Sequence, residues 1–394
     1  MILTAAVFFL ILSVLILIHE AGHYFVAKKF GIKVEEFGFG LPPRLWGKKK
    51  GETIYSLNWL PIGGFVKLYG EDDAGAGKLS LPTENGERRT ENKDIQRAFY
   101  SRSIGQRSAV VLAGVVMNTL LAVIIYYTFL GISGFKTDLP MLGHHTFFLV
   151  NQKENTEVFI NEVAKDSPAQ KSGLKPLSRV LSLNGQKITS LETFSNTVKA
   201  NKGKPITIEW QDVKTMKNTT TTVVPRLNPP KGQGALGIAF SPLSTVTLSY
   251  DTPMQKAFSG FVHPANLMTY NFVVMKSLID VSVEKKTVAP ISEGVSGPVG
   301  IYSLVGTIVD IPDVKERVLQ LLNLAGLLSI SLAFFNVLPI PGLDGGRFFF
   351  IAIEAITRKK VNPKVEGYAH AIGMILLLAL IALVTFKDIA QLFK

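Results

Sequence analysis

The sequence predicts a polytopic α-helical membrane protein, and three observations lead to this fold class. The chain has 394 residues, of which 47% are hydrophobic and only 18% charged, too few charges to cover a soluble surface of this size. Four largely uncharged stretches reach the length of about 18 residues that is needed to cross a hydrocarbon core roughly 30 Å thick. Basic residues gather in two of the segments between them. This composition excludes disordered, collagen-like and coiled-coil proteins.

The four stretches are taken in chain order as predicted membrane spans, at residues 1–27, 107–135, 317–346 and 365–387. The first carries one charged side chain, Glu20, ahead of Lys28. The alternative for this first stretch is a cleaved signal peptide. A basic start and a small-residue cleavage site are missing, so we expect the stretch to remain in the mature protein. A fifth uncharged stretch over 257–275 contains His263 and Pro264 and is flanked by lysines. We expect it to form a helix in the membrane interface.

The distribution of Lys and Arg predicts the orientation of the chain. Residues 28–107 hold 15 of these side chains and residues 347–364 hold another five. Short basic loops stay in the cytoplasm, so both segments are predicted to be cytoplasmic and the amino terminus extracytoplasmic. Residues 136–317 then lie outside, since long translocated domains are largely exempt from the charge rule. The net charge of +12 is therefore a topology signal, and no nucleic-acid partner is expected.

The inner end of the first span carries the pattern H-E-x-x-H, formed by His19, Glu20 and His23. Residues four apart lie on one helix face, so both imidazoles can reach one metal ion while the Glu lies beside its open position. The chain has no cysteine, so a transition-metal site must use His, Asp and Glu. Zinc suits these ligands, because it lowers the pKa of a bound water to about 7 and the Glu can take the proton. With six His in the chain, a chance match is expected on the order of once in several hundred sequences.

A third ligand is expected at the same depth in another span, and Asp344 is the best candidate. It follows Pro339 and Pro341, which break the third span and free backbone groups that lipid could not satisfy. The orientation derived from charge brings Asp344 to the same side of the membrane as His19. The alternative is a solvated acid at a helix terminus before a Gly-Gly turn.

Taken together, these motifs resemble the site-2 protease family of zinc intramembrane metalloproteases, particularly its bacterial members. H-E-x-x-H in the first span is paired with N-x-x-P-x-P-x-L-D-G-G over 336–346 in the third. Residues 37–40 and 60–67 are similar to the family's membrane re-entrant β-loop, and residues 296–301 resemble its S-G-P-V-G-I segment. The second span is also similar, although Val115 stands where the family commonly has proline.

The resemblance implies a site with one Zn²⁺ ion, three ligands and a general base, namely His19, His23, Asp344 and Glu20. It also implies a set of substrate-positioning residues: Asn336, Asn118, Gly63 and Gly64. For Asn118 the alternative is a hydrogen bond that joins two spans.

Cleavage of a membrane helix requires local unwinding, because the helix hydrogen-bonds its own carbonyl groups. A β-loop over about 33–70 could hold the unwound segment by β-addition, in which the segment pairs as an extra strand with an exposed sheet edge. Within this loop, aromatic and β-branched residues over 53–59 and 65–69 favour two strands joined by a Gly-Gly bend. An ordinary cytoplasmic hairpin is the alternative. Residues 71–106 complete the cytoplasmic segment 28–106 as a polar loop.

Residues 150–240 alternate short apolar strands with turn signals and are similar to a circularly permuted bacterial PDZ domain, a β-rich α+β fold. Residues 177–179 stand where that pattern usually has Gly-Asp, which leaves binding of peptide termini open. The domain could bind substrate tails, or exclude proteins with bulky outer domains by size. Residues 241–316 are predicted to be an interfacial amphipathic region that includes the end of this domain.

The predicted function is that of a zinc-dependent intramembrane endopeptidase in the bacterial inner (plasma) membrane. Its expected substrates are single-pass membrane proteins trimmed beforehand by another protease, such as anti-sigma factors, or remnant signal peptides. The alternatives are a zinc transporter or sensor and a non-proteolytic PDZ scaffold. A transporter predicts ionisable residues spread across the bilayer, and a vestigial site predicts loss of a ligand or base. The remaining histidines are expected to be interfacial or structural: His144, His145, His263 and His370.

Overall fold

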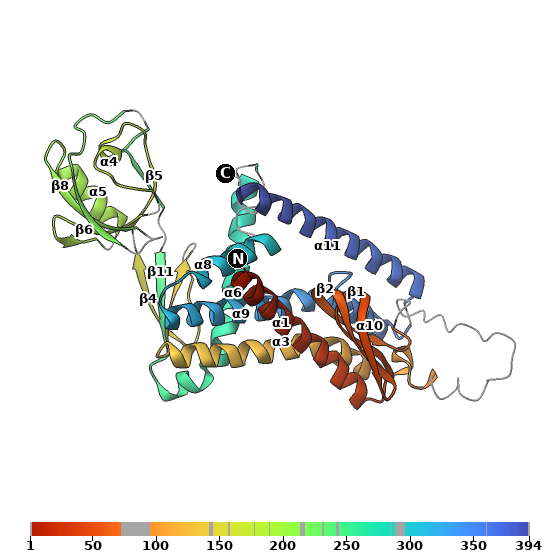
Figure 1. Cartoon of the computed structure of the whole chain (residues 1–394). Helices are drawn as coiled ribbons and strands as arrows, with labels where there is room; N and C mark the ends of the chain where they lie inside the picture. Colours follow the sequence, from red (N-terminus) through yellow and green to blue (C-terminus); the bar gives the residue numbers. More distant parts are fainter. Residues whose placement is uncertain are drawn as a thin grey trace, which may run out of the picture. The chain divides into compact units, whose positions relative to one another are not determined.

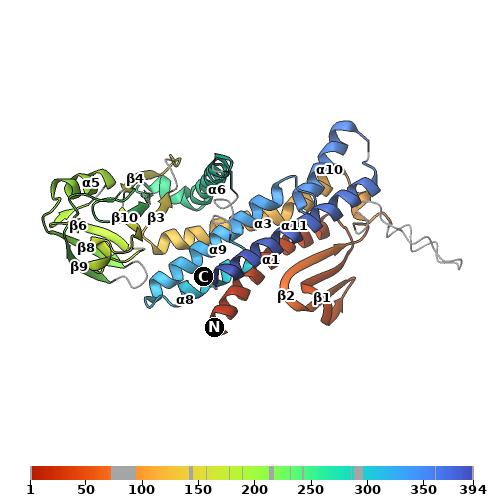
Figure 2. The same ribbon diagram turned by 90° about the horizontal axis from the view of Figure 1, so that it is seen from above.

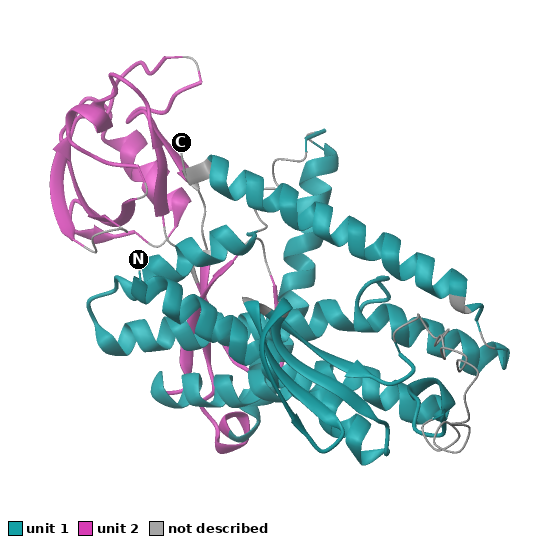
Figure 3. Cartoon of the chain, turned by 45° about the vertical axis from the view of Figure 1, so that its right-hand side comes forward, with its two compact units in different colours: residues 1–133, 257–394 teal, residues 134–256 magenta. Residues whose placement is uncertain are grey.

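The chain folds into two compact units, which are coloured separately in Figure 3. The first unit comprises Met1–Ser133 and Ala257–Lys394, and the second Gly134–Lys256. The computed structural model describes residues 2–71, 95–141, 145–156, 158–176, 178–188, 190–212, 217–230, 232–241, 244–284, 286–287, 296–359 and 361–392. The sequence predictions for residues 72–94, for His144 and for residue 177 lie outside the described residues.

Among the described residues of the first unit, four helices are long and apolar enough to cross a membrane. They are α1 (Ile2–Lys29), α3 (Ile104–Ile132), α9 (Val314–Val337) and α11 (Pro363–Leu392). This confirms the prediction of four such helices. α1 and α9 both pack along α3, as Figures 1 and 2 show. α3 begins with a capping box in which Ser103 and Gln106 satisfy each other's backbone N–H groups.

The third apolar segment, predicted over 317–346, is interrupted where its two prolines were expected to break it. α9 ends at Val337, a turn follows, and α10 (Asp344–Thr357) starts a new helix. The two prolines of this turn lack an N–H group and cannot continue the helix. Gly345 lets the start of α10 pack against the end of α9, since a Cβ there would lie 2.0 Å from the carbonyl oxygen of Leu338. Asp344 therefore stands in the first turn of a new helix, whereas it was predicted near the end of the span over 317–346.

A β-sheet follows α1 and is made of two long, bent strands, β1 (Val34–Lys50) and β2 (Thr53–Leu68). Their register places residues 36–39 between residues 54–57 on one side and residues 64–67 on the other. The two halves of β2, predicted as two strands joined by a Gly-Gly bend, therefore pair with β1 on either side and not with each other. The chain turns at Gly63, whose φ of 92° is the left-handed conformation that glycine tolerates.

One edge of this sheet is formed by residues 64–67. In the described part of the chain they pair with β1 on one side only. The opposite edge is formed by residues 44–50, which pair with the first half of β2. An edge strand presents unpaired backbone N–H and C=O groups to any segment that lies beside it.

The turn between β1 and β2 is fixed to the end of α1 by a small ion-pair network. Glu52 Oε1 accepts hydrogen bonds from Lys28 Nζ at 2.6 Å and from Arg97 Nη2 at 2.8 Å. Arg97 Nη1 also lies 2.7 Å from Glu52 Oε2, which makes this pair bidentate. The hydrogen bonds from Arg97, and then from Lys28, lower the pKa of Glu52 to about 2.

Two further helices complete the first unit, α6 (Pro253–Glu284) and α8 (Pro298–Val309). The stretch predicted to be an interfacial helix over 257–275 lies wholly within α6; its place in the interface stays a prediction. α8 is joined to the end of α11 by the Asp388 carboxylate, whose Oδ2 accepts the backbone N–H groups of Gly297 and Gly300 at 2.9 and 2.8 Å. This carboxylate satisfies two of the N–H groups that the start of a helix leaves without partners.

The second unit is built around a twisted antiparallel sheet with the strand order β10-β5-β6-β8-β9. Its strands are β5 (Val158–Val163), β6 (Ser178–Leu183), β8 (Ile206–Asp212), β9 (Asn218–Val223) and β10 (Ile238–Ser241). A short strand, β7 (Gln186–Lys187), pairs with β6, and the helices are α4 (Pro168–Lys171) and α5 (Leu191–Ala200). The core of this β-rich domain contains the buried rings of Phe194 and Trp210.

A separate three-stranded sheet also belongs to the second unit. It consists of β3 (Lys136–Met141), β4 (Asn151–Thr156) and β11 (Ser244–Ser249), in the order β3-β11-β4. The domain predicted over 150–240 therefore differs at its start, because residues 151–156 pair with β11 instead of joining the larger sheet. These strands come from segments about 100 residues apart, a pairing that no local pattern indicates.

The Glu52 network predicts a defined pH dependence of stability. Its folded-state pKa of about 2 lies below the ordinary 4.5, so its contribution is complete above about pH 5 and is lost as the pH falls towards 2. We expect Glu52→Gln to destabilise the protein at neutral pH by at most about 3 kcal/mol, reduced by partial exposure to solvent. Thermal unfolding in detergent should show the difference between wild type and variant shrinking between pH 4.5 and 2.

Arg97→Gln removes the bidentate partner and should reproduce the same pH profile. A Glu52→Gln difference that stays constant from pH 7 down to pH 2 would contradict this account of the network.

Candidate metal centre

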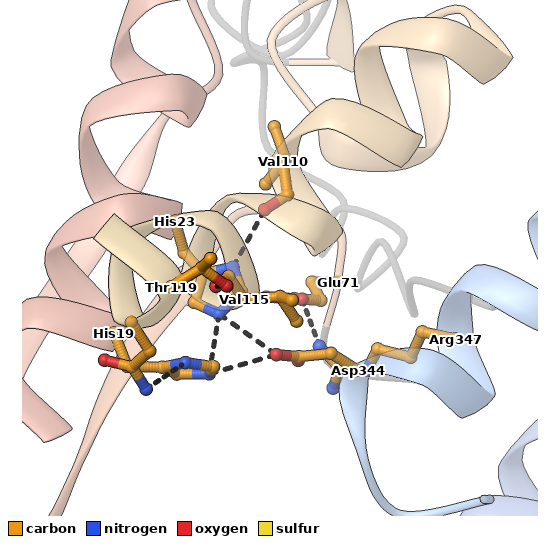
Figure 4. A network of polar contacts seen from close by, with 9 residues as sticks. His19, His23, Glu71, Val110, Val115, Thr119, Asp344 and Arg347 are labelled. Carbon is orange, nitrogen blue, oxygen red and sulfur yellow. Dashed lines mark hydrogen bonds and ion pairs between the residues drawn. The ribbon is translucent and has the colours of Figure 1, made fainter. Parts of the chain in front are cut away.

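Three side chains with metal-binding atoms meet where α1 faces the start of α10 (Figure 4). His19 Nε2 lies 3.0 Å and His23 Nε2 3.3 Å from Asp344 Oδ2, and the two Nε2 atoms are 3.2 Å apart. The histidines are one helical turn apart on α1, whereas Asp344 lies 325 residues after His19. The structure thus brings together the three residues that the sequence marks as candidate ligands.

The donor set fits zinc. Two imidazole nitrogens and one carboxylate oxygen are ligands that Zn²⁺ commonly takes, and three protein ligands leave one position open, as in catalytic zinc sites. All three ligand atoms lie within 4.8 Å of one another. Among the described residues this is the one group of three such side chains that is close enough to hold a metal ion.

α3 orients His23 through its backbone. His23 Nδ1 lies 2.8 Å from the carbonyl oxygen of Val110. A carbonyl oxygen can only accept, so Nδ1 carries the proton, and Nε2, which faces Asp344, is the atom that would bind a metal ion. Such a hydrogen bond on the far nitrogen is the usual way in which a metal-binding imidazole is held in place.

The other imidazole contacts the same helix at Asn118. The Asn118 amide nitrogen lies 3.2 Å from His19 Nδ1, and the whole residue is inaccessible to solvent. Asn118 is not among the residues that line the cavity beside this centre, which differs from the substrate-positioning role predicted for it. Its backbone carbonyl accepts a 2.8 Å hydrogen bond from Ser329 Oγ on α9.

Glycine at position 114 allows α3 to approach both imidazoles. A Cβ there would lie 2.5 Å from His19 Cε1 and 2.5 Å from His23 Nε2, closer than any carbon atom can come. The backbone of α3 therefore packs flat against the two rings. A side chain at this position would push α3 away from α1.

A cavity of about 650 Å³ opens beside the three candidate ligands. Glu20, Asn336, Gly63 and Gly64, all predicted from the sequence, line it. So do residues 65–68, which continue the sheet edge. Gly64 lies close to the candidate base, since a Cβ added there would be 3.2 Å from Glu20 Cγ. The cavity therefore joins the candidate metal ligands to an acid and to an exposed strand edge.

Three cavity residues were missed by the sequence analysis. His370 on α11 accepts the backbone N–H of Gly342 at 2.9 Å and so supports the turn that precedes Asp344. Arg347 forms an ion pair with Glu71, and both line the cavity. Arg347 comes three residues after Asp344, and a helix predicted to begin there would have placed both on one face. For His370 and Glu71 the sequence offers no such spacing to a predicted ligand.

Comparison with known proteins identifies relatives along almost the whole chain. The model of peptidase family M50 matches residues 7–380. A Clostridium perfringens protein named as a zinc metalloprotease is 34% identical over 377 residues, which is 96% of each chain. The zinc metalloprotease RasP of Geobacillus kaustophilus is 26% identical and covers 98% of this chain and 97% of its own. The regulator of sigma-W protease RasP of Bacillus subtilis is 27% identical, with 99% of both chains covered.

Among solved structures, a PDZ domain of an SdrC-like protein from Listeria monocytogenes is similar to 21% of this chain and to 85% of its own. Its sequence identity is 21% and its TM-score 0.19, which is too low to carry an argument. The matches over almost the whole chain do support a family assignment, because they include both segments that carry the candidate ligands. The chain therefore belongs to peptidase family M50, the site-2 protease family, and is a zinc metalloprotease with membrane-spanning helices.

Proposed function

We propose that this zinc metalloprotease hydrolyses peptide bonds inside the membrane segments of single-pass proteins. One observation carries the proposal: His19 and His23 lie on α1, which is apolar enough to span a bilayer, and Asp344 begins α10 at the break that follows α9, a second such helix. Ionisable side chains in such helices are unfavourable unless they have partners or a function. The name of the Bacillus subtilis relative, regulator of sigma-W protease, supports a regulatory membrane substrate such as an anti-sigma factor.

In the proposed site, His19, His23 and Asp344 hold one zinc ion. When bound, Zn²⁺ acts as a Lewis acid and lowers the pKa of a bound water to about 7. Glu20 takes the proton of the attacking water and returns it to the leaving nitrogen. Asn336, on the cavity wall, donates its amide N–H to the substrate carbonyl oxygen as negative charge develops there.

The sheet edge at residues 64–67 holds the substrate in the proposed mechanism. A helical substrate must be unwound before its carbonyl groups are accessible, and an unwound segment needs partners for its backbone. The edge lies along the cavity, and at residues 64–66 one side of it has no strand partner in the described chain. Gly64 adds no side chain that would keep the substrate from Glu20. Exposed Trp46 and Trp59 elsewhere on the sheet support its entry into the membrane.

We further propose that the protein lies in the bacterial inner membrane with its amino terminus and second unit outside the cytoplasm. The excess of Lys and Arg over 28–107 and 347–364 supports this orientation. The second unit would be the PDZ domain, which admits substrates by binding their tails or by excluding large outer domains. In either case another protease acts first and removes the outer domain of the substrate.

The role of Glu20 predicts a loss of activity without a loss of metal. Glu20→Gln keeps the size and hydrogen bonding of the side chain but removes the base, so cleavage should fall about 10²–10⁴-fold. The zinc content of the purified variant should equal that of wild type. The measurement is cleavage of a single-pass substrate in liposomes, together with metal analysis of the same preparations.

Glu316→Gln, in the first turn of α9, is the matched control and should cleave normally. Unchanged cleavage by Glu20→Gln would reject the proposed base, and loss of zinc from that variant would assign Glu20 to metal binding instead.

β-Addition at the sheet edge can be tested by cross-linking, because the chain contains no cysteine. Lys67 lies on the edge that lines the cavity, and Lys48 lies on the opposite edge of the same sheet. Lys67→Cys in a Glu20→Gln background should form disulfides with single cysteines placed along the substrate. An extended substrate predicts cross-links that alternate with a period of two residues.

Lys48→Cys, the same substitution on the far edge, should give few cross-links. A helical period of three to four substrate positions, or equal cross-linking from both edges, would be inconsistent with β-addition.

A further inference from the structure

α3 contacts both histidines of the candidate metal centre from one face of the helix. Val110, Gly114 and Asn118 are four residues apart, so they form one row along α3. A helical carbonyl points towards the carboxyl end of the helix, and a side chain leans towards the amino end. The Val110 carbonyl and the Asn118 amide therefore converge on Gly114, where the two rings pack. One helix face thus sets the orientation of both rings.

The two contacts differ in what they specify. The Val110 carbonyl can only accept, so it selects the His23 tautomer with the proton on Nδ1. An asparagine amide has a donor and an acceptor of nearly the same shape, so it can serve either tautomer of His19. In the structure the amide nitrogen is 3.2 Å from His19 Nδ1, and the amide oxygen, also buried, has no hydrogen-bond partner among the described residues.

Metal binding decides which of its two orientations the Asn118 side-chain amide takes. Nε2 is the nitrogen of His19 that faces Asp344, at 3.0 Å, so Nε2 would bind the ion. An imidazole that binds through Nε2 must carry its proton on Nδ1, and this buried N–H then needs an acceptor. The Asn118 amide is the group within hydrogen-bond distance, and its oxygen is available. A half-turn of the amide places that oxygen against Nδ1.

The backbone around Asn118 is held independently of its side chain. Ser329 Oγ on α9 donates to the Asn118 carbonyl oxygen at 2.8 Å, and both residues are fully buried. This hydrogen bond holds the backbone of α3 in position along α9. The side-chain amide of Asn118 can therefore rotate while it stays beside His19. The backbone carbonyl of Asn118 thus makes the contact with α9, and its side-chain amide makes the contact with His19.

We propose that Asn118 is a positioning residue whose side-chain oxygen accepts the Nδ1–H of His19 and so fixes the tautomer that presents Nε2 to the metal. The inference rests on the proposed ligation by His19. It replaces the substrate-positioning role predicted for Asn118, and it assigns to α3 the orientation of both metal-binding rings.

The test is zinc affinity, measured without substrate on the full-length protein in detergent. The metal is removed with a chelator and zinc is then titrated in competition with a chromophoric indicator. Asn118→Leu removes the acceptor and should weaken zinc binding about 10–100-fold. Asn118→Asp keeps an oxygen towards Nδ1 and should retain most of the affinity. Thr119→Val is the matched control, because Thr119 donates to the Val115 carbonyl of its own helix, and it should bind zinc as wild type does.

The outcomes separate this inference from the proposed function. Asn118→Leu with wild-type zinc affinity but slower cleavage would restore the substrate-positioning role and overturn the inference. Asn118→Asp that binds more weakly than Asn118→Leu would also overturn it, because the amide N–H would then be the group required. If Asn118→Leu does not fold, as judged by thermal unfolding, the comparison of Asn118→Asp with wild type decides. If His19→Ala keeps wild-type affinity, the proposed ligation fails and this inference with it.

Discussion

The structure of the first unit depends on one constraint: polar groups within apolar helices must find partners inside the protein, because lipid offers none. His19 and His23 meet this constraint through each other, through Asp344 and through α3. Gly114 is a direct consequence, since the rings can reach the backbone of α3 only where no side chain intervenes. α3 is thus placed by its contacts with the two histidines as well as by its packing against α1 and α9.

The same constraint acts on the backbone between α9 and α10. Breaking an apolar helix leaves backbone N–H and C=O groups without their helical partners. Neighbouring residues of the protein supply new partners here. The N–H of Gly342 is bound by His370, and α11 approaches the turn so closely that a Cβ at Gly373 would lie 2.0 Å from the carbonyl oxygen of Pro341. An interrupted helix is tolerated where protein or a cavity surrounds it. Here it also places Asp344 opposite the two histidines, so the break that disturbs the backbone also forms the candidate site.

Residue types and short spacings were enough to predict part of the fold and of the candidate site. H-E-x-x-H defines a helix face by itself, and Asp344 could be paired with it because charge distribution predicted the same side of the membrane. Features that depend on long-range packing could not be predicted in this way. The order of the strand segments around residues 36–39, the pairing of β4 with β11 and the cavity position of His370 all result from contacts between distant segments. The burial of Asn118 is of the same kind, because it depends on how α3 lies against α1 and α9.

Zinc X-ray absorption spectroscopy can measure whether His19, His23 and Asp344 together hold one zinc ion. We expect one zinc per chain, two imidazole nitrogens at about 2.0–2.1 Å, oxygen for the remaining ligands and no sulfur. Asp344→Ala should lower zinc occupancy under the same conditions while the protein stays folded. Full occupancy and an unchanged spectrum in Asp344→Ala, or a spectrum with more than two imidazoles in wild type, would contradict this expectation.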